Sequence, residues 1–126
     1  MPSEPLGILL ISGTHERAHY AFVVAAGAAA LGRPVVLFAT NEGCRALLTD
    51  WSELQESGRD AAVRARGVAG LGELREAAVQ LGVRMIACEA GLRMVGFDGS
   101  ALLAGTEVAG VTTFLEATKG GQIVSL

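Results

Sequence analysis

Short apolar runs alternate with helix-like segments along almost the whole sequence, and this alternation constrains the fold more than any other feature. Five runs indicate buried strands, because they are apolar and end at glycine, proline or small polar residues. They cover residues 6–11, 34–40, 83–88, 106–111 and 121–126. Strands that alternate with helices form a parallel sheet with helices on both faces. We therefore predict an α/β fold, a single-domain three-layer sandwich over residues 1–126, with a mostly parallel five-stranded sheet of the flavodoxin or Rossmann type.

The segments between the strands read as helices, and one polar stretch is less regular. Residues 49–67 indicate one irregular helix or an ordered excursion. In open parallel sheets, ligands bind beyond the carboxyl ends of the strands, where the strand order reverses. We expect the strand order 2-1-3-4-5, which places residues 12–17 and 88–93 on one crevice. Helices are expected over residues 15–31, 42–48, 70–81, 89–95, 100–104 and 112–118.

Composition excludes several classes of partner. The formal net charge is −3 and the basic residues form no cluster, so no nucleic-acid partner is expected. The longest apolar run is too short for a membrane span. Two cysteines without a leader-like N-terminus favour a reducing compartment, and we expect a cytoplasmic protein. A mean hydropathy of +0.44 is high for a small domain and favours a homo-oligomer.

The stretch "HERAH", residues 15–19, matches the H-E-x-x-H pattern of zinc proteases. Such a site needs a third ligand and an extended cleft, whereas the sequence contains no other histidine and the following helix is rich in alanine. We interpret the match as accidental and His19 as a half-buried helix residue. His15 differs, because it follows the first strand directly, and we take it as a candidate binding residue.

Cys88 closes the third predicted strand and opens a helix. A thiolate is the nucleophilic form of cysteine, and the unpaired N–H groups at a helix start stabilise negative charge. Arg93 lies further along the same segment and is a candidate for binding an anion. Cys44 follows the second strand and is a candidate second thiol, if the two Cα atoms approach within about 7 Å. His15, Cys44 and Cys88 lack the spacing of a structural zinc site, so no metal or cofactor is expected.

The segment "GVRMIACEAGLRMVGFDGSALLAGTEVAGVTTFL", residues 82–115, resembles the DsrE/DsrF-like family of small sulfur-handling proteins, including the DsrE2-type members that are labelled peroxiredoxins. The likeness consists of a strand ending in Cys88, a glycine eight residues later at Gly96, and the closing "VAGVTTFL". Upstream, "AFVVAAGAAALGRPVVLFAT" and "GVAGLGELREAAVQLGV" are similar to the first helix, second strand and third helix of the family. Two positions depart from the pattern, because many relatives carry Gln and a polar residue such as Ser where this chain has Glu89 and Gly91.

The resemblance implies a compact domain that assembles into trimers or hexamers, and a cysteine that carries sulfur as a persulfide. Only Cys88 matches that cysteine. The leading hypothesis is a sulfur carrier or sulfurtransferase that exchanges sulfur with a donor or acceptor protein or a small sulfur species. One alternative is a non-catalytic ligand-binding or regulatory subunit, and another is a peroxidase-like thiol redox protein that also needs Cys44. A dinucleotide enzyme is disfavoured, because "SGTHERAHYAF" offers one glycine instead of G-x-G-x-x-G.

Overall fold

The computed structural model describes residues 4–126, so positions 1–3 of the predicted domain lie outside the described residues. Its centre is a five-stranded sheet in which every pairing is parallel. The α/β class and the mostly parallel sheet predicted from the sequence are confirmed. The strands are β1 (Leu6–Leu10), β2 (Val35–Ala39), β3 (Arg84–Cys88), β4 (Glu107–Ala109) and β5 (Gln122–Ser125).

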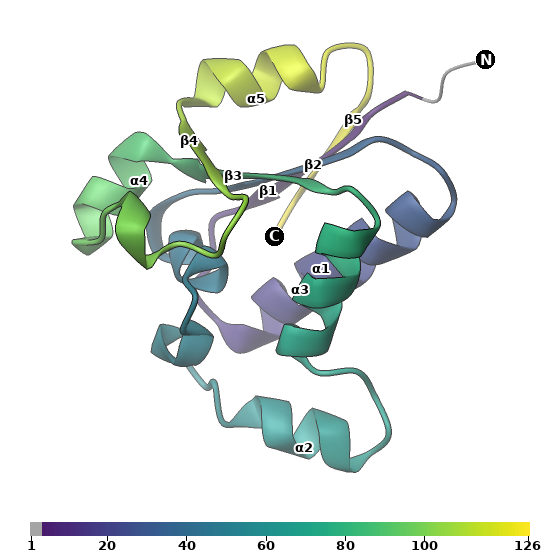
Figure 1. Ribbon diagram of the computed structural model, residues 1–126, viewed down its shortest axis with the longest axis vertical. Coiled ribbons are helices and arrows are strands. Elements are labelled where there is room, and N and C mark those ends of the chain that lie inside the picture. Colours follow the sequence, from purple (N-terminus) through teal and green to yellow (C-terminus); the bar gives the residue numbers. More distant parts are fainter. Residues whose placement is uncertain (1–3) are drawn as a thin grey trace.

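Helices connect the strands and form the outer layers. Helices α1 and α3 lie on one face of the sheet, and α5 lies on the other face (Figure 1). The α-helices are α1 (His15–Ala30), α2 (Arg59–Ala65), α3 (Leu71–Gln80), α4 (Glu89–Val95) and α5 (Val111–Ala117). The 3₁₀ helices are η1 (Asn41–Leu47), η2 (Trp51–Glu53) and η3 (Gly99–Ala101). The irregular polar stretch thus contains η2 and α2, and no described helix is long and apolar enough to cross a membrane.

The strand order is β4-β3-β2-β1-β5, so the predicted order 2-1-3-4-5 was wrong. The physical reason lies in β2, whose five residues are all buried. Such a strand needs a neighbour on each side and a helix layer on each face. The predicted order would have placed it at an edge, whereas the edge strands are in fact β4 and β5, which are largely exposed.

This order changes which strand ends share a crevice. Strand β2 lies between β1 and β3, so the segments that follow β1 and β3 do not meet directly. The chain adds β2, β3 and β4 on one side of β1 and then returns through α5 to place β5 on the other side. The strand order therefore reverses between β1 and β5, and this is where the fold favours a ligand.

Two apolar clusters hold the layers together. The larger one lies between the sheet and the α1 and α3 layer and includes Phe22, Leu37 and Cys44. The smaller one lies under α5, where the rings of Phe38 and Phe114 stack with centroids 5.0 Å apart. Because α5 has only seven residues, it covers little of its face of the sheet. This face is therefore less protected than the opposite one.

Candidate functional site

Cys88 lies at the junction of β3 and α4. It is the last residue of β3 and the N-cap residue of α4, and its Sγ accepts a hydrogen bond from the Gly91 backbone N–H at 3.5 Å. Its side chain belongs to the apolar cluster under α5, and 8% of the residue remains exposed. The residue is thus buried, and its sulfur faces a backbone donor, which suits a group that becomes negatively charged.

Gly91 permits this arrangement because α4 packs closely against the start of η1. A Cβ atom added at Gly91 would lie 2.5 Å from the backbone nitrogen of Asn41 and 3.1 Å from the Cα of Thr40. Distances below 3.0 Å to backbone atoms are not tolerated without movement of the chain. The absence of a polar side chain three positions after Cys88 therefore has a packing cause in this protein.

Cys44 is near Cys88 but in a different environment. It has no exposed surface, it belongs to the cluster on the α1 and α3 side, and its Sγ–H donates to the Ala39 carbonyl oxygen at 3.5 Å. Burial, and then the negative charge of the Cys88 thiolate, raise the pKa of Cys44 from 9.0 to about 12. The two thiols belong to clusters on opposite faces of the sheet. Cys44 is therefore a protonated core residue at neutral pH.

Arg93 lies on the exposed side of α4. Its Nη2 donates to Oε1 of Glu89 at 3.0 Å, one helical turn earlier. Both residues line a cavity of about 180 Å³ beside the carboxyl end of β3, and Cys88 is not among the lining residues. Val108, which pairs with the residue before Cys88, closes the cavity on the β4 side. The cavity is thus lined by Glu89, the residue after Cys88, but the Cys88 side chain does not line it.

His15 has no exposed surface and points into a buried polar cluster at the start of α1. Its Nε2 lies 2.8 Å from Oδ1 of Asp60, and its Nδ1 lies 3.3 Å from Nη1 of Arg59. An arginine N–H can only donate, so Nδ1 accepts and Nε2 carries the hydrogen directed at Asp60. Because β2 separates β1 from β3, this cluster is not part of the surroundings of Cys88.

Asp60 is the anchor of this cluster. It accepts a second hydrogen bond from the Leu71 backbone N–H at 2.7 Å. Burial alone would raise the pKa of Asp60, but the hydrogen bonds from Leu71 and His15 outweigh burial and hold that pKa below its ordinary value. The cluster was missed in the sequence, because 45 positions separate His15 from Asp60 and no spacing links them.

The two histidines of the H-E-x-x-H match are occupied by protein partners. The His19 Nε2 donates to the Ala69 carbonyl oxygen at 2.8 Å, and the ring stacks on that of His15 with centroids 5.5 Å apart. Within residues 4–126, no group of three or more His, Cys, Asp or Glu side chains is arranged to hold a metal ion. His15 therefore joins α1 to α2, and His19 joins α1 to the segment that leads into α3.

Comparisons with known proteins agree with this architecture. A family model described as the DsrE/DsrF/DrsH-like family matches residues 48–124, which include Cys88. Among solved structures, the ychN protein from E. coli superposes with a TM-score of 0.75 at 13% identity, over 98% of this chain and 99% of that chain. MTH1491 from Methanobacterium thermoautotrophicum, a protein of unknown function, superposes with a TM-score of 0.61 at 20% identity, over 98% and 100% of the two chains. A search of curated proteins found no match.

The family assignment rests on the family model, and the solved structures show the same fold. The matched region covers more than half of the chain and extends from the segment after η1 to β5. The solved structures share the fold along nearly the whole chain. The resemblance read from residues 82–115 is confirmed: the chain belongs to the DsrE/DsrF/DrsH-like family.

Proposed function

We propose that this protein is a sulfur carrier in which Cys88 holds sulfur as a persulfide and passes it to a partner thiol. The observation that carries the proposal is the position of Cys88 at the end of β3 and the start of α4, where Sγ accepts a hydrogen bond from the Gly91 N–H. The membership of a family with sulfur-relay members supports the same chemistry. Small sulfur species or donor and acceptor proteins are the proposed partners.

The proposed cycle has two balanced displacement steps. In the first, the Cys88 thiolate attacks the outer sulfur of a donor persulfide; a new S–S bond forms, the donor S–S bond breaks, and the donor leaves as a thiolate. In the second, an acceptor thiolate attacks the outer sulfur on Cys88, which is released as a thiolate. Neither step needs an oxidant. The Gly91 N–H stabilises the negative charge on the Cys88 sulfur whenever it is the attacking or leaving group.

Arg93 and Cys44 have different proposed roles in this cycle. Arg93 lies on the exposed side of α4, the helix that begins directly after Cys88, and its guanidinium is proposed to exchange its contact with Glu89 for an anionic donor that approaches this helix. Cys44 is proposed to remain a thiol, because its raised pKa leaves almost no thiolate at neutral pH. The peroxidase-like alternative depends on Cys44 as a reactive partner and is therefore less well supported than sulfur transfer.

We also propose that the protein self-associates through the face covered by α5, in a reducing compartment such as the cytoplasm. Val111 and Leu115 lie one helical turn apart on α5 and are each about half exposed, at 51% and 52%. Ile123 is exposed on the neighbouring edge strand β5. Several exposed apolar side chains around a short helix favour a protein contact over solvent. The trimer or hexamer expected from the family resemblance is the proposed assembly.

The test of sulfur transfer is mass spectrometry of the full chain after incubation with cysteine persulfide, polysulfide or thiosulfate. We expect one added sulfur atom on the peptide that contains Cys88, removed again by a thiol acceptor. The variant Cys88→Ser should gain nothing, whereas Cys44→Ala, the matched control, should load as the parent does. Failure of every donor to load Cys88, or equal loading of both cysteines, would contradict the proposal.

A further inference from the structure

A cavity of about 360 Å³ lies between η2, α2 and α3, and no step of the proposed sulfur transfer uses it. Figure 1 shows α2 beyond α3 and away from the sheet. Two of the lining residues lie one turn apart on α2 and two lie one turn apart on α3, so each helix presents one face to the cavity. The lining residues are Trp51, Asp60, Arg64, Gly72, Glu73 and Glu76.

The carboxylate of Asp60 forms the buried part of this lining, because only 7% of the residue is exposed. The two hydrogen bonds that it accepts, from the His15 ring and from the Leu71 backbone N–H, both end on Oδ1. No hydrogen bond reaches Oδ2 from residues 4–126, yet Oδ2 is not sealed from solvent as Nε of Arg75 and Oγ1 of Thr106 are. Oδ2 is therefore the free acceptor that Asp60 offers to the cavity.

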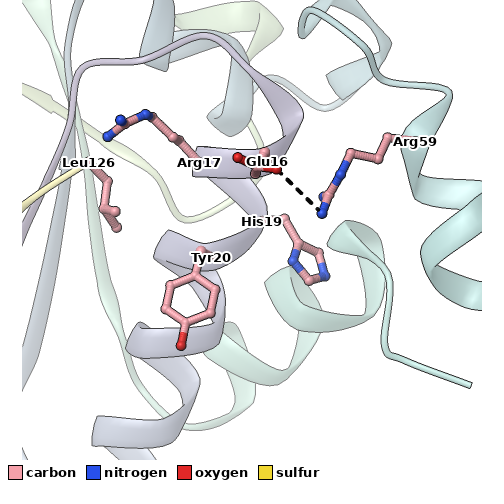
Figure 2. Close-up of a pocket in the computed structure, with 6 residues that line it drawn as sticks. All are labelled: Glu16, Arg17, His19, Tyr20, Arg59 and Leu126. Carbon is pink, nitrogen blue, oxygen red and sulfur yellow. Dashed lines mark ion pairs between the residues drawn. The ribbon is translucent and has the colours of Figure 1, made fainter.

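The charge of Asp60 has no cationic partner in the described part of the chain. Burial raises the pKa of Asp60 less than its hydrogen bonds lower it, so the carboxylate is ionised at pH 7. The His15 ring donates from Nε2 and accepts at Nδ1 from Arg59, so it is neutral. Arg59 itself faces Glu16 of α1, 3.8 Å away (Figure 2). Because buried charges in proteins are normally paired, the open side of Asp60 favours a cationic ligand.

The remaining charges leave the cavity negative. Three carboxylates and one guanidinium line it. The guanidinium of Arg64 pairs with Glu73 at 3.0 Å, and both side chains are more than half exposed, so these two charges offset each other. Glu76 makes no ion pair with any residue of the described chain. The excess of negative charge attracts a cation and disfavours an anion.

An aromatic side chain borders the cavity close to Asp60. The ring centroid of Trp51 lies 6.0 Å from that of His15, whose Nε2 lies 2.8 Å from Oδ1 of Asp60. Trp51 and Asp60 thus flank one imidazole ring, and their separation is within the length of a small molecule. Gly72 leaves room beside the indole, because a Cβ atom added there would meet only Nε1 of Trp51, at 3.8 Å. An indole near a carboxylate suits an ammonium group that carries an apolar body.

We propose that this cavity binds a small organic cation, a primary ammonium group joined by a short chain to an apolar body. The ammonium group donates to Oδ2 of Asp60, and the body lies against Trp51 in the space that Gly72 leaves open. The site is independent of sulfur transfer, because Cys88 belongs to the apolar cluster on the other face of the sheet.

Trp51 is the single tryptophan of the sequence, so its fluorescence reports directly on this cavity. The probe is 2-phenylethylammonium chloride, titrated into the full-length chain at pH 7 with selective excitation of tryptophan. We expect a saturable change in emission. 2-Phenylethanol keeps the shape but loses the charge, and methylammonium chloride keeps the charge but loses the body. Each should bind more weakly than the probe by about fivefold or more.

Variants assign the contacts to residues. Asp60→Asn should abolish the preference for 2-phenylethylammonium over 2-phenylethanol, a ratio that a loss of stability alone does not change. Glu116→Gln, the matched control, removes the same charge from the exposed side of α5 and should keep the preference. Gly72→Leu should block binding by filling the cavity, whereas Gly72→Ala should bind the probe, because its methyl group lies at an ordinary contact distance from Trp51.

The cation site and the sulfur site can fail separately. Cys88→Ser should bind the probe as the parent does, and Asp60→Asn should still gain sulfur on Cys88. Four results would each overturn the proposal: no saturable change in emission, equal binding of the alcohol and the ammonium by the parent, the parent's preference retained in Asp60→Asn, or normal binding by Gly72→Leu.

Discussion

The buried thiol of Cys44 should make the stability of this protein fall at alkaline pH. In the folded protein the pKa of Cys44 is raised from 9.0 to about 12, chiefly by burial and next by the charge of Cys88. The folded state therefore binds the Cys44 proton more tightly than the unfolded state does. The resulting stabilisation is fully present below pH 9 and is lost as the pH rises from 9 towards 12.

The size of the effect follows from the two pKa values. A difference of three pH units between them corresponds to about 4 kcal/mol in total. Between pH 8 and pH 11 the free energy of unfolding should fall by about 3 kcal/mol through Cys44 alone. This is a large fraction of the roughly 5–15 kcal/mol that stabilises a domain of this kind. The effect is therefore within reach of ordinary denaturation experiments.

The assay is urea unfolding followed by circular dichroism at pH 8, 9, 10 and 11. The parent chain is compared with Cys44→Ala. In the difference between their unfolding free energies, the contributions of titrating groups that the substitution leaves unchanged cancel. Cys44→Ala should have a lower free energy of unfolding than the parent at pH 8, and this difference should shrink as the pH rises. Since burial is the larger cause, the same trend should persist, reduced, in a Cys88→Ser background. A parent-to-variant difference that is constant from pH 8 to pH 11 would refute the assignment of a raised pKa to Cys44.

Three further predictions concern packing, assembly and the buried carboxylate. Gly91→Ser should lower the free energy of unfolding by about 1–3 kcal/mol, because the new Cβ meets the backbone of Asn41. The control Ala90→Ser, on the exposed side of α4, should lower it by less than about 1 kcal/mol. Equal losses for the two variants in urea unfolding would contradict the close packing at Gly91. Leu115→Glu should reduce the mass measured by light scattering without changing the circular dichroism spectrum, and an unchanged mass would exclude the α5 face as the interface. Asp60→Asn should lower the free energy of unfolding by about 1–3 kcal/mol at pH 7. Below pH 4, where Asp60 of the parent takes up a proton, the free energy of unfolding should fall less steeply in the variant than in the parent. The same acid profile in both proteins would refute this.

Local sequence signals predicted most of the secondary structure, because each depends on neighbouring residues only. Apolar runs located all five strands within a few residues, and the helix expected over residues 15–31 corresponds to α1. The position of Cys88 at the junction of β3 and α4 followed from the same kind of signal.

Features that depend on distant segments were not predicted. The strand order required knowing that β2 is buried along its whole length, which depends on which strands flank it. The pairing of His15 with Asp60 depends on where α2 packs against α1, in a polar stretch for which the sequence indicated only one irregular helix or an ordered excursion. The different environments of Cys44 and Cys88 follow from the face of the sheet to which each side chain belongs, and one residue of register decides that.

The pairing of β1 with β5 has a consequence for the order in which the edges of the sheet open. Leu6 pairs with Gln122, so the last strand joins the sheet across nearly the full length of the chain, and such distant contacts form late in folding. β5 is an exposed edge strand with one neighbour, so it should detach more readily than β2 or β3. Because Leu126 forms part of the wall of the cavity drawn in Figure 2, detachment of β5 opens that wall. Fraying of this sheet edge therefore also loosens the surface around Leu126, and amide hydrogens of β5 should exchange faster than those of β2 and β3.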